Sequence, residues 1–303
     1  MKQLKKFLFI FALIGFSTLM VTSCQKDAGM DGLKGTLHLS ITDAPIDAYD
    51  IVGVYITITG IEYNHNGEWK VFEDFEGPQT FNLLELTNGV SEMLGSFEME
   101  AGTYTQIRFM LDAPVMGSGI PSNPGCWLEF ADESTVPLFV PSGGQTGYKA
   151  VGEFTVPVNG DVYVTADFDV RKSIVVAGAS GIFILKPTIR LVVEDQAGQI
   201  EGILENMEED TEYLVFAYEA GAYAEEEAED PEEGEARFPN AVVSTAVNEE
   251  GGFLLAFLAE GFYDLVIVAL VEGEFSEVVG IYEDVEVISK MTTNVTIDLT
   301  QFE

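Results

Sequence analysis

Alternating apolar and polar residues recur in short stretches along most of this chain. Apolar side chains occupy every second position from Thr36 to Thr42, and β-branched and aromatic residues continue from Ile51 to Tyr63. Such alternation is typical of strands that bury one face in a core and expose the other. The same pattern predicts seven further strands, at Trp69–Phe72, Gly102–Leu111, Trp127–Phe130, Val136–Val140, Val151–Val156, Val162–Phe168 and Gly181–Val193.

Turn-forming residues separate these stretches, as at Asn66-Gly67 and Asn159-Gly160. Between Leu83 and Met93 apolar residues recur near a 3.6-residue period, which predicts a short helical turn. Many short strands joined by glycine-rich turns indicate a sandwich or barrel, whereas strands and helices do not alternate regularly here. We therefore predict an all-β fold class with two consecutive antiparallel β-sandwich domains.

The C-terminal third continues in the same style, with strands expected at Gly198–Leu204, Glu212–Tyr218, Ala241–Val247, Gly251–Leu265 and Met291–Leu299. It is interrupted by an acidic block, Glu225–Glu235, that contains eight carboxylates and Pro231. Mutual repulsion and a proline disfavour a strand, so this block is expected to form a solvated loop.

The charge is distributed unevenly and divides the chain. The formal net charge is -37, from 14 Lys and Arg against 51 Asp and Glu. From Gln199 onward there are 27 acidic residues and two basic ones, Arg237 and Lys290. This shift and the turn-prone Glu194–Gly198 predict a domain boundary near residue 197, which gives domains at 35–196 and 197–303. Such an acidic chain repels nucleic acid, so no nucleic-acid partner is expected.

The first 24 residues have the form of a bacterial lipoprotein signal. Three lysines precede an apolar run from Phe7 to Met20, and Val21-Thr22-Ser23-Cys24 resembles a lipobox. The resemblance implies that residues 1–23 are removed as a signal peptide and that Cys24 carries the lipid, followed by a tether at 24–34. A secretory signal or a spanning anchor is the alternative, but the apolar run is shorter than the roughly 20 residues that a spanning helix needs.

The residues after Cys24 bear on localisation. Gln25, Lys26 and Asp27 resemble a short export signal of Gram-negative lipoproteins more than an inner-membrane retention signal. We therefore expect an outer-membrane lipoprotein that is exposed on the cell surface and attached to the membrane through its lipid, with periplasmic facing as the alternative.

Five short motifs carry a resemblance to a known family, and they occur in a fixed order. They are Ser40–Pro45, Ala101–Arg108, Val140–Gly147, Asp167–Ser173 and Leu185–Arg190. Together, over about residues 35–193, they resemble the bacterial lipoprotein family named domain of unknown function 4382. The resemblance implies a β-sandwich on a bacterial lipoprotein and supplies no activity.

The last third resembles a second family. The rhythm of Gly252-Phe253, Leu258, Gly261, Tyr263 and Leu265 is similar to that of carboxypeptidase regulatory-like, transthyretin-like sandwiches. In that family such modules are mostly structural spacers or sugar-associated domains, so the resemblance implies no catalytic residues.

Candidate chemistry is sparse. The two histidines, His38 and His65, lack the spacing of a zinc site or of a nucleophile's partner. With Cys24 lipidated, Cys126 is the remaining cysteine, which excludes an internal disulfide. We expect no catalytic residue, metal ligand or cofactor, and we interpret the chain as a non-enzyme.

Several charged and aromatic residues have two interpretations each. Asp43, Asp47 and Asp50 are either calcium ligands or, as we prefer, a turn cap and two solvated carboxylates. Asp167 and Asp169 share a strand face, and so do Lys186 and Arg190 on the next strand, which predicts pairs of opposite charge that hold the sheet together. The aromatic residues that would stack on sugars, if they do not simply pack in the core, are Trp69, Trp127, Tyr49 and Tyr148.

These observations favour a membrane-anchored lipoprotein of the cell envelope that acts as a non-catalytic binding or scaffolding module. One alternative is a glycan-binding accessory protein of carbohydrate uptake, and another is a carboxylate-dependent hydrolase. A cell-surface glycan and a protein remain the open partner classes.

Overall fold

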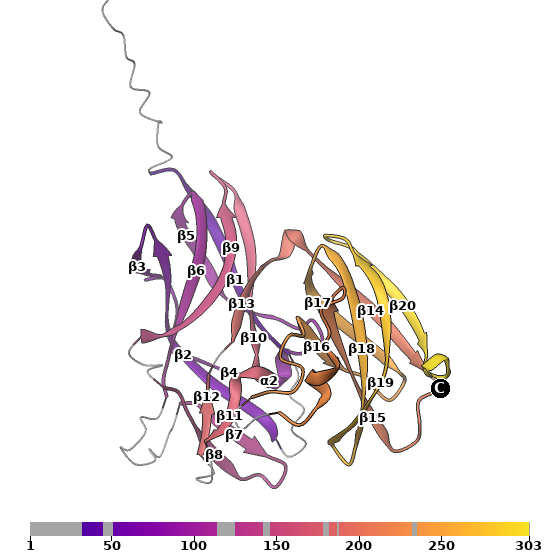
Figure 1. Ribbon diagram of the computed structural model, residues 1–303. Helices are drawn as coiled ribbons and strands as arrows, with labels where there is room; N and C mark the ends of the chain where they lie inside the picture. Colours follow the sequence, from indigo (N-terminus) through magenta and orange to yellow (C-terminus); the bar gives the residue numbers. More distant parts are fainter. Residues whose placement is uncertain are drawn as a thin grey trace, which may run out of the picture.

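The structure is a computed structural model that describes residues 32–44, 51–113, 125–141, 146–177, 182–186, 188–231 and 235–302. The all-β prediction is confirmed, because strands make up nearly all of its regular structure. Figure 1 shows the strands in two groups, an N-terminal half (β1–β13) and a C-terminal half (β14–β20) beside it. No helix in the described residues is long and apolar enough to cross a membrane.

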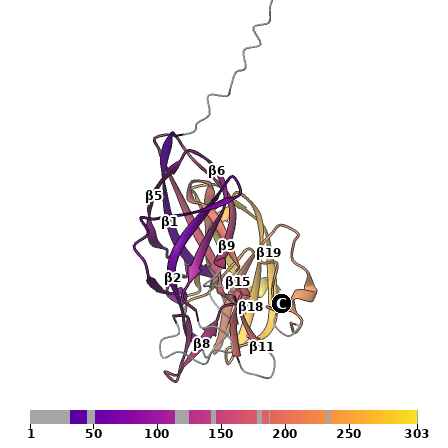
Figure 2. The ribbon, with the colours of Figure 1, turned by 90° about the vertical axis from the view of Figure 1, so that its left-hand side faces the viewer.

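The N-terminal half is one hydrogen-bonded sheet in the order β11-β12-β8-β7-β2-β6-β9-β13-β10-β1-β5, with β3 and β4 on the free edge of β2. Its strands are β1 (Lys34–Ala44), β2 (Ile51–His65), β3 (Glu68–Val71), β4 (Gln79–Asn82), β5 (Glu92–Glu100), β6 (Gly102–Leu111), β7 (Trp127–Phe130), β8 (Thr135–Phe139), β9 (Tyr148–Val156), β10 (Asp161–Asp169), β11 (Ile174–Ala177), β12 (Ile182–Leu185) and β13 (Ile189–Val193). The sheet coils around a single core, so Phe72 after β3 stacks on Phe97 of β5 at 4.3 Å. Figure 2 views this half from its outer side.

The C-terminal half consists of two sheets, β17-β14-β20 and β16-β15-β18-β19. Its strands are β14 (Ala197–Glu205), β15 (Thr211–Glu219), β16 (Val243–Ala246), β17 (Gly252–Ala259), β18 (Gly261–Val271), β19 (Glu274–Val287) and β20 (Thr292–Asp298). One core lies between the sheets, and a second covers the other face of β15 and β18. Burial on both faces explains why these two strands are apolar almost throughout rather than alternating.

Most strand pairs are antiparallel, as expected, but four are parallel. These are β1 with β10, β9 with β13, β8 with β12, and β14 with β20. Parallel neighbours need a long connection between them, and in each case other strands intervene in the sequence. Alternation along a strand does not reveal the direction of its partner.

The predicted helical turn at Leu83–Met93 is only partly correct. A 3-10 helix, η1, spans Leu83–Leu86, but Met93 already lies in β5. A bulge between β1 and β5 shifts their register next to Leu94, and the buried residues of β5 are therefore Leu94, Phe97 and Met99. The spacing of three between Leu94 and Phe97 resembles a helical period, so the sequence pattern did not predict this strand.

Candidate functional site

Three strands of the N-terminal half end side by side against the C-terminal half. Because β1 and β10 run parallel, their carboxyl ends lie at the same edge. The register pairs Thr42 with Asp167, and Asp167 with Arg190 of β13. Three of the five sequence motifs therefore meet at one place, which we call the junction.

Buried ion pairs fill the junction. Arg190 Nη2 lies 2.6 Å from Oδ2 of Asp167, as the cross-strand prediction expected. Asp169 Oδ2 lies 3.0 Å from Arg171 Nη2 and 3.1 Å from Lys172 Nζ. Arg171 and Lys172 belong to a short helix, α2 (Val170–Ser173), which follows β10 directly and has Asp169 as its N-cap. The carboxylates thus hold three cations in a chain that is otherwise strongly acidic.

The same three cations bind the C-terminal half. Each donates a hydrogen bond to a backbone carbonyl there: Arg171 Nη1 to Phe238 at 3.4 Å, Lys172 Nζ to Ala241 at 2.7 Å, and Arg190 Nη1 to Phe257 at 2.9 Å. Phe238 and Phe257 have φ values of 56° and 57°, in the left-handed region that bulky residues rarely adopt. Tertiary contacts must stabilise such a backbone, and these hydrogen bonds are contacts of that kind.

The turn between η1 and β5 forms a further contact across the junction. Thr42 Oγ1 lies 2.9 Å from the carbonyl oxygen of Leu86 and 2.7 Å from that of Val90, and its hydroxyl holds the turn between them. At the tip of this turn, Asn88 Oδ1 accepts a hydrogen bond from the Thr245 hydroxyl at 2.5 Å. The two halves therefore form a connected unit at the turn as well as at the ion pairs.

Burial and charge act in opposite directions on these groups. Burial raises the pKa of Asp169, but the adjacent Arg171 and Lys172 outweigh this effect and hold the pKa below its ordinary value. For Lys172 burial is the stronger effect and lowers the pKa, although Asp169 opposes it. The two pKa shifts are compatible. Both groups lose hydration on burial, but Asp169 has two cationic partners that outweigh this loss, whereas Lys172 has one carboxylate partner.

The junction encloses very little free space. Asp43, Asp167 and Ser244 border a void of about 10 Å³, which is the room of one water molecule. Asp167 Oδ1 and Ser244 Oγ have no hydrogen-bond partner in the described part of the chain. Nor do the described residues include a group of three or more His, Cys, Asp or Glu placed to hold a metal ion. The ion pairs with Arg171, Lys172 and Arg190 give Asp169 and Asp167 a structural role in joining these elements.

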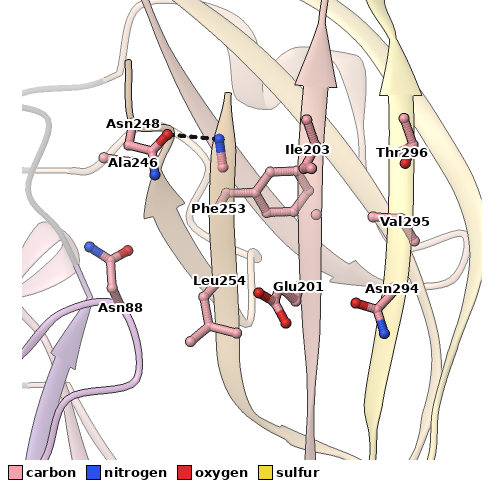
Figure 3. Close-up of a pocket in the computed structure, with 12 residues that line it drawn as sticks. Asn88, Glu201, Ile203, Ala246, Asn248, Phe253, Leu254, Asn294, Val295 and Thr296 are labelled. Atoms are coloured by element: carbon pink, nitrogen blue, oxygen red, sulfur yellow. Dashed lines mark hydrogen bonds between the residues drawn. The ribbon is translucent and has the colours of Figure 1, made fainter. Parts of the chain in front are cut away.

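An open groove lies beside the junction, on the outer face of the β17-β14-β20 sheet (Figure 3). Its volume is about 530 Å³, and the turn that carries Asn88 forms one wall. We call it the amide groove, because three carboxamides line it together with a carboxylate, a hydroxyl and an exposed apolar side chain: Asn88, Asn248, Asn294, Glu201, Thr296 and Ile203.

Strand pairing sets the arrangement of the amide groove. Glu201 of β14 pairs with Asn294 of β20, and Ile203 pairs with Thr296 two residues further on. Residues two apart share a face, so all four side chains point outward. Ile203 is 50% exposed although it lies in the central strand of its sheet. The groove thus presents polar groups together with an exposed aliphatic side chain.

The aromatic candidates do not form a common site. Trp69 is half-buried beneath the guanidinium of Arg108, which lies 4.3 Å from its ring centroid. Trp127 stacks on Tyr55 at 4.5 Å, and the hydroxyl of Tyr148 donates to a backbone carbonyl at 3.0 Å. None of these side chains lines the amide groove.

The histidines and the cysteine have local partners. His38 Nδ1 lies 2.8 Å from Ser96 Oγ and its ring stacks on Tyr163 at 4.4 Å, while His65 Nε2 lies 3.4 Å from a carboxylate oxygen of Glu100. Burial raises the pKa of the Cys126 thiol to about 12. Such a thiol remains protonated and unreactive at neutral pH.

The expectation that Lys186 shares a face with Arg190 is wrong. Lys186 lies at the end of β12, its backbone N–H donates to the Ser173 carbonyl at 2.7 Å, and its side chain is exposed. The predicted strand Gly181–Val193 is broken between β12 and β13. The partners of Asp169 are instead the residues that immediately follow it.

The acidic block is partly ordered by its own contacts. It begins with a 3-10 helix, η4 (Glu225–Ala228), and the Glu227 carboxylate accepts hydrogen bonds from the Tyr218 hydroxyl at 2.9 Å and the Asn240 side-chain amide at 2.9 Å. Beyond it, Glu229 and Asp230 are exposed. Among the described residues of the block, 225–231 and 235, none lies in a strand, as the loop prediction expected, whereas Glu227 is not simply solvated.

Of the remaining candidate residues, the structure describes Asp43 but not the others. Asp43 Oδ1 accepts a hydrogen bond from the Val170 N–H at 3.1 Å, so this carboxylate joins the end of β1 to the start of α2. Cys24, Asp47, Asp50 and Tyr49 lie outside the described residues.

Sequence reasoning did not assign roles to Arg171, Lys172 or Asn88. A usable signal for the first two is their position directly after the strand that bears Asp167 and Asp169, in a chain with few basic residues. For Asn88 the signal is the Asn88-Gly89 dipeptide, which marks a turn. Neither signal indicates that the partners lie in the other half of the chain.

One protein family matches the chain. The model of the domain of unknown function DUF4382 matches residues 34–187, about half of the sequence. No curated protein matches the chain.

The similar solved structures are distant. They include a leucine-rich repeat protein from Bacteroides thetaiotaomicron (13% identity, TM-score 0.20, 88% of this chain and 26% of that one). Two others are the shaft pilin spaA from Lactobacillus rhamnosus GG (10%, 0.23, 87% and 97%) and GBS52, the minor pilin of Streptococcus agalactiae (14%, 0.21, 86% and 94%). The chain spans about a quarter of the leucine-rich repeat protein. None of these similarities supplies a function.

Proposed function

Since this chain belongs to the DUF4382 family, a domain of unknown function, we propose from its own features that it is a lipid-anchored, non-catalytic binding module of the bacterial cell envelope. The observation that carries this proposal is the contrast between the junction and the amide groove. In the junction, the buried carboxylates of Asp167 and Asp169 are paired with cationic side chains. The open amide groove instead presents three uncharged carboxamides.

The hydrolase alternative has less support. Two carboxylates in one cleft are the usual requirement for glycoside hydrolysis. Glu201 is the carboxylate among the described residues that line the amide groove. Binding without turnover is therefore the function that this surface favours.

Replacing Cys24 with Ala tests the anchor. The lipobox predicts that the variant loses its acyl chains, and two or three chains make the difference between marginal and stable attachment. We expect the parent to sediment with the membranes and the variant to appear in the soluble fraction or to retain its signal peptide. A Cys126→Ala variant is the matched control, because that thiol is buried and should not influence attachment. A variant at Cys24 that is processed and membrane-bound like the parent excludes lipidation.

The proposal places both halves on the cell surface, and this is testable with a Glu-specific protease. We expect the protease, when it is added to intact cells, to cut this protein near Glu229. The side chain of Glu229 is exposed, whereas that of Glu227 is held by hydrogen bonds from Tyr218 and Asn240. A short tether of about ten residues, roughly 17 Å if flexible, keeps the rest of the chain close to the membrane. Cleavage seen only after the outer membrane is permeabilised would show that the protein faces the periplasm.

A further inference from the structure

We propose that the amide groove binds a short, neutral oligosaccharide. This inference rests on the proposed binding-module function and names the ligand class of its open surface. It is carried by the groove's hydrogen-bonding groups, by its charge and by its aliphatic side chains.

Internal contacts already hold two of the three carboxamides through their oxygen atoms. Asn248 Oδ1 accepts hydrogen bonds from the backbone N–H groups of Glu250 at 2.9 Å and Gly252 at 2.8 Å, and Figure 3 shows the latter bond. Asn88 Oδ1 accepts from the Thr245 hydroxyl. Both side chains are therefore fixed, and within the described part of the chain their NH₂ groups have no partner. They are preorganised donors on the wall of the groove.

The opposite side of the groove supplies acceptors. The Glu201 carboxylate and the Asn294 amide are paired neighbours on β14 and β20, and Thr296 follows on β20. The carboxylate only accepts hydrogen bonds, whereas the amide and the hydroxyl both donate and accept. A ligand that satisfies both walls must itself donate and accept at several points. Sugar hydroxyls do both.

The apolar part of the groove suits the other surface of a sugar ring. Ile203 is half exposed beside Thr296, and Leu254 lies next to Glu201 on the paired strand β17 (Figure 3). The C–H groups of a pyranose ring form an apolar face that can cover such side chains. The groove volume of about 530 Å³ lies in the range of small-molecule sites, about 300–1,000 Å³.

The charge of the amide groove favours a neutral ligand over an acidic one. No Lys or Arg is among the described residues that line the groove, and Glu201 makes its potential negative, so acidic glycans are repelled. A basic peptide is the competing occupant. Its cationic side chains would pair with Glu201, and the amide N–H groups of Asn88 and Asn248 would then depend on its backbone carbonyls for acceptors, whereas every hydroxyl of a sugar can accept and donate.

The test is calorimetric titration of the full-length protein in detergent with four neutral trisaccharides: maltotriose, cellotriose, mannotriose and chitotriose. We expect at least one to bind. In Asn248→Asp the side chain keeps the oxygen that holds the turn but loses the NH₂ donors, and we expect about a tenfold weaker affinity from the loss of a hydrogen bond. Asn294→Asp, on the other strand, should weaken binding similarly. Asn159→Asp, the same change in the distant β9–β10 turn, should bind like the parent.

Pentalysine is titrated in parallel to separate the ligand class from the binding function. Binding of no trisaccharide, or binding that is unchanged in both groove variants, overturns the inference. If pentalysine binds instead and Glu201→Gln abolishes its binding, the oligosaccharide is excluded while the binding-module function stands. If neither the trisaccharides nor pentalysine bind to the parent protein, although circular dichroism shows that it is folded, the result contradicts the binding-module function itself.

Discussion

Replacing Arg190 with Met is expected to lower the free energy of unfolding by about 3 kcal/mol, because it leaves the Asp167 carboxylate buried without its counter-ion. Asp167 is only 4% exposed, so bulk water cannot replace the lost partner. The substitution also removes the hydrogen bond to the Phe257 carbonyl, which is one of the three that the junction cations donate to the C-terminal half. The expected value is at the lower end of the usual range since the side chain of Arg190 is itself 29% exposed.

Urea unfolding at neutral pH measures this effect. Both tryptophans, Trp69 and Trp127, lie in the N-terminal half, so their fluorescence reports on that half while tyrosine signals and circular dichroism also report on the other. Lys186→Met is the matched control, because Lys186 is exposed and near Arg190 in sequence. A double variant that also replaces Asp167 with Leu should recover most of the loss. An Arg190 variant as stable as the Lys186 control would show that the pair contributes nothing.

Several strands with one buried face were predictable, although β4, β11 and β19 were not predicted. Thr36–Thr42 and Trp127–Phe130 fall within β1 and β7, because an alternating pattern directly reflects one buried face. The strand β5 escaped prediction, since a bulge next to Leu94 interrupts its period. The local sequence shows which residues are apolar. A bulge in the pairing of two strands changes the spacing of the buried residues, and the sequence carries no separate signal for the bulge.

The charge pairs show a similar division. The Asp167–Arg190 pair was predictable, because both residues belong to recognisable strands and their charges are opposite. The contacts that join the halves were not predictable, since the acceptors are backbone carbonyls of Phe238, Ala241 and Phe257. Every residue has a carbonyl, and only the folded chain determines which ones face a cation.

The amide groove was beyond sequence reasoning for a related reason. Asn88 and Asn248 are ordinary turn residues in the sequence, and Asn294 is one polar residue on an alternating strand. They come together only because the turn of one half docks beside a sheet of the other. Aromatic residues drew attention as sugar ligands, yet Trp69 and Trp127 lie elsewhere and pack against Arg108 and Tyr55.

Replacing Asp169 with Asn is expected to have the larger effect, a loss of about 3–5 kcal/mol at neutral pH, since two buried cations then share no carboxylate. Arg171 is 4% exposed and cannot regain water, and Lys172 is also largely covered. The Asn side chain keeps an oxygen that can accept the Lys172 backbone N–H at the start of α2, so the variant isolates the loss of charge from the loss of the cap.

The same pair predicts how the difference depends on pH. The folded-state pKa of Asp169 lies below its ordinary value of 3.8, because Arg171 and Lys172 outweigh the effect of burial. A depressed carboxyl pKa contributes stability that is fully present above the unfolded value and is lost as the pH falls through the folded value. The stability difference between parent and variant should therefore be constant from pH 7 down to about pH 5 and shrink at lower pH. Asp195→Asn is the control, because its pair with Lys290 is exposed and should show neither the loss nor the pH dependence. If the Asp169 variant differs from the parent by the same amount at pH 3 as at pH 7, then the ionised carboxylate is not what holds the junction cations in place.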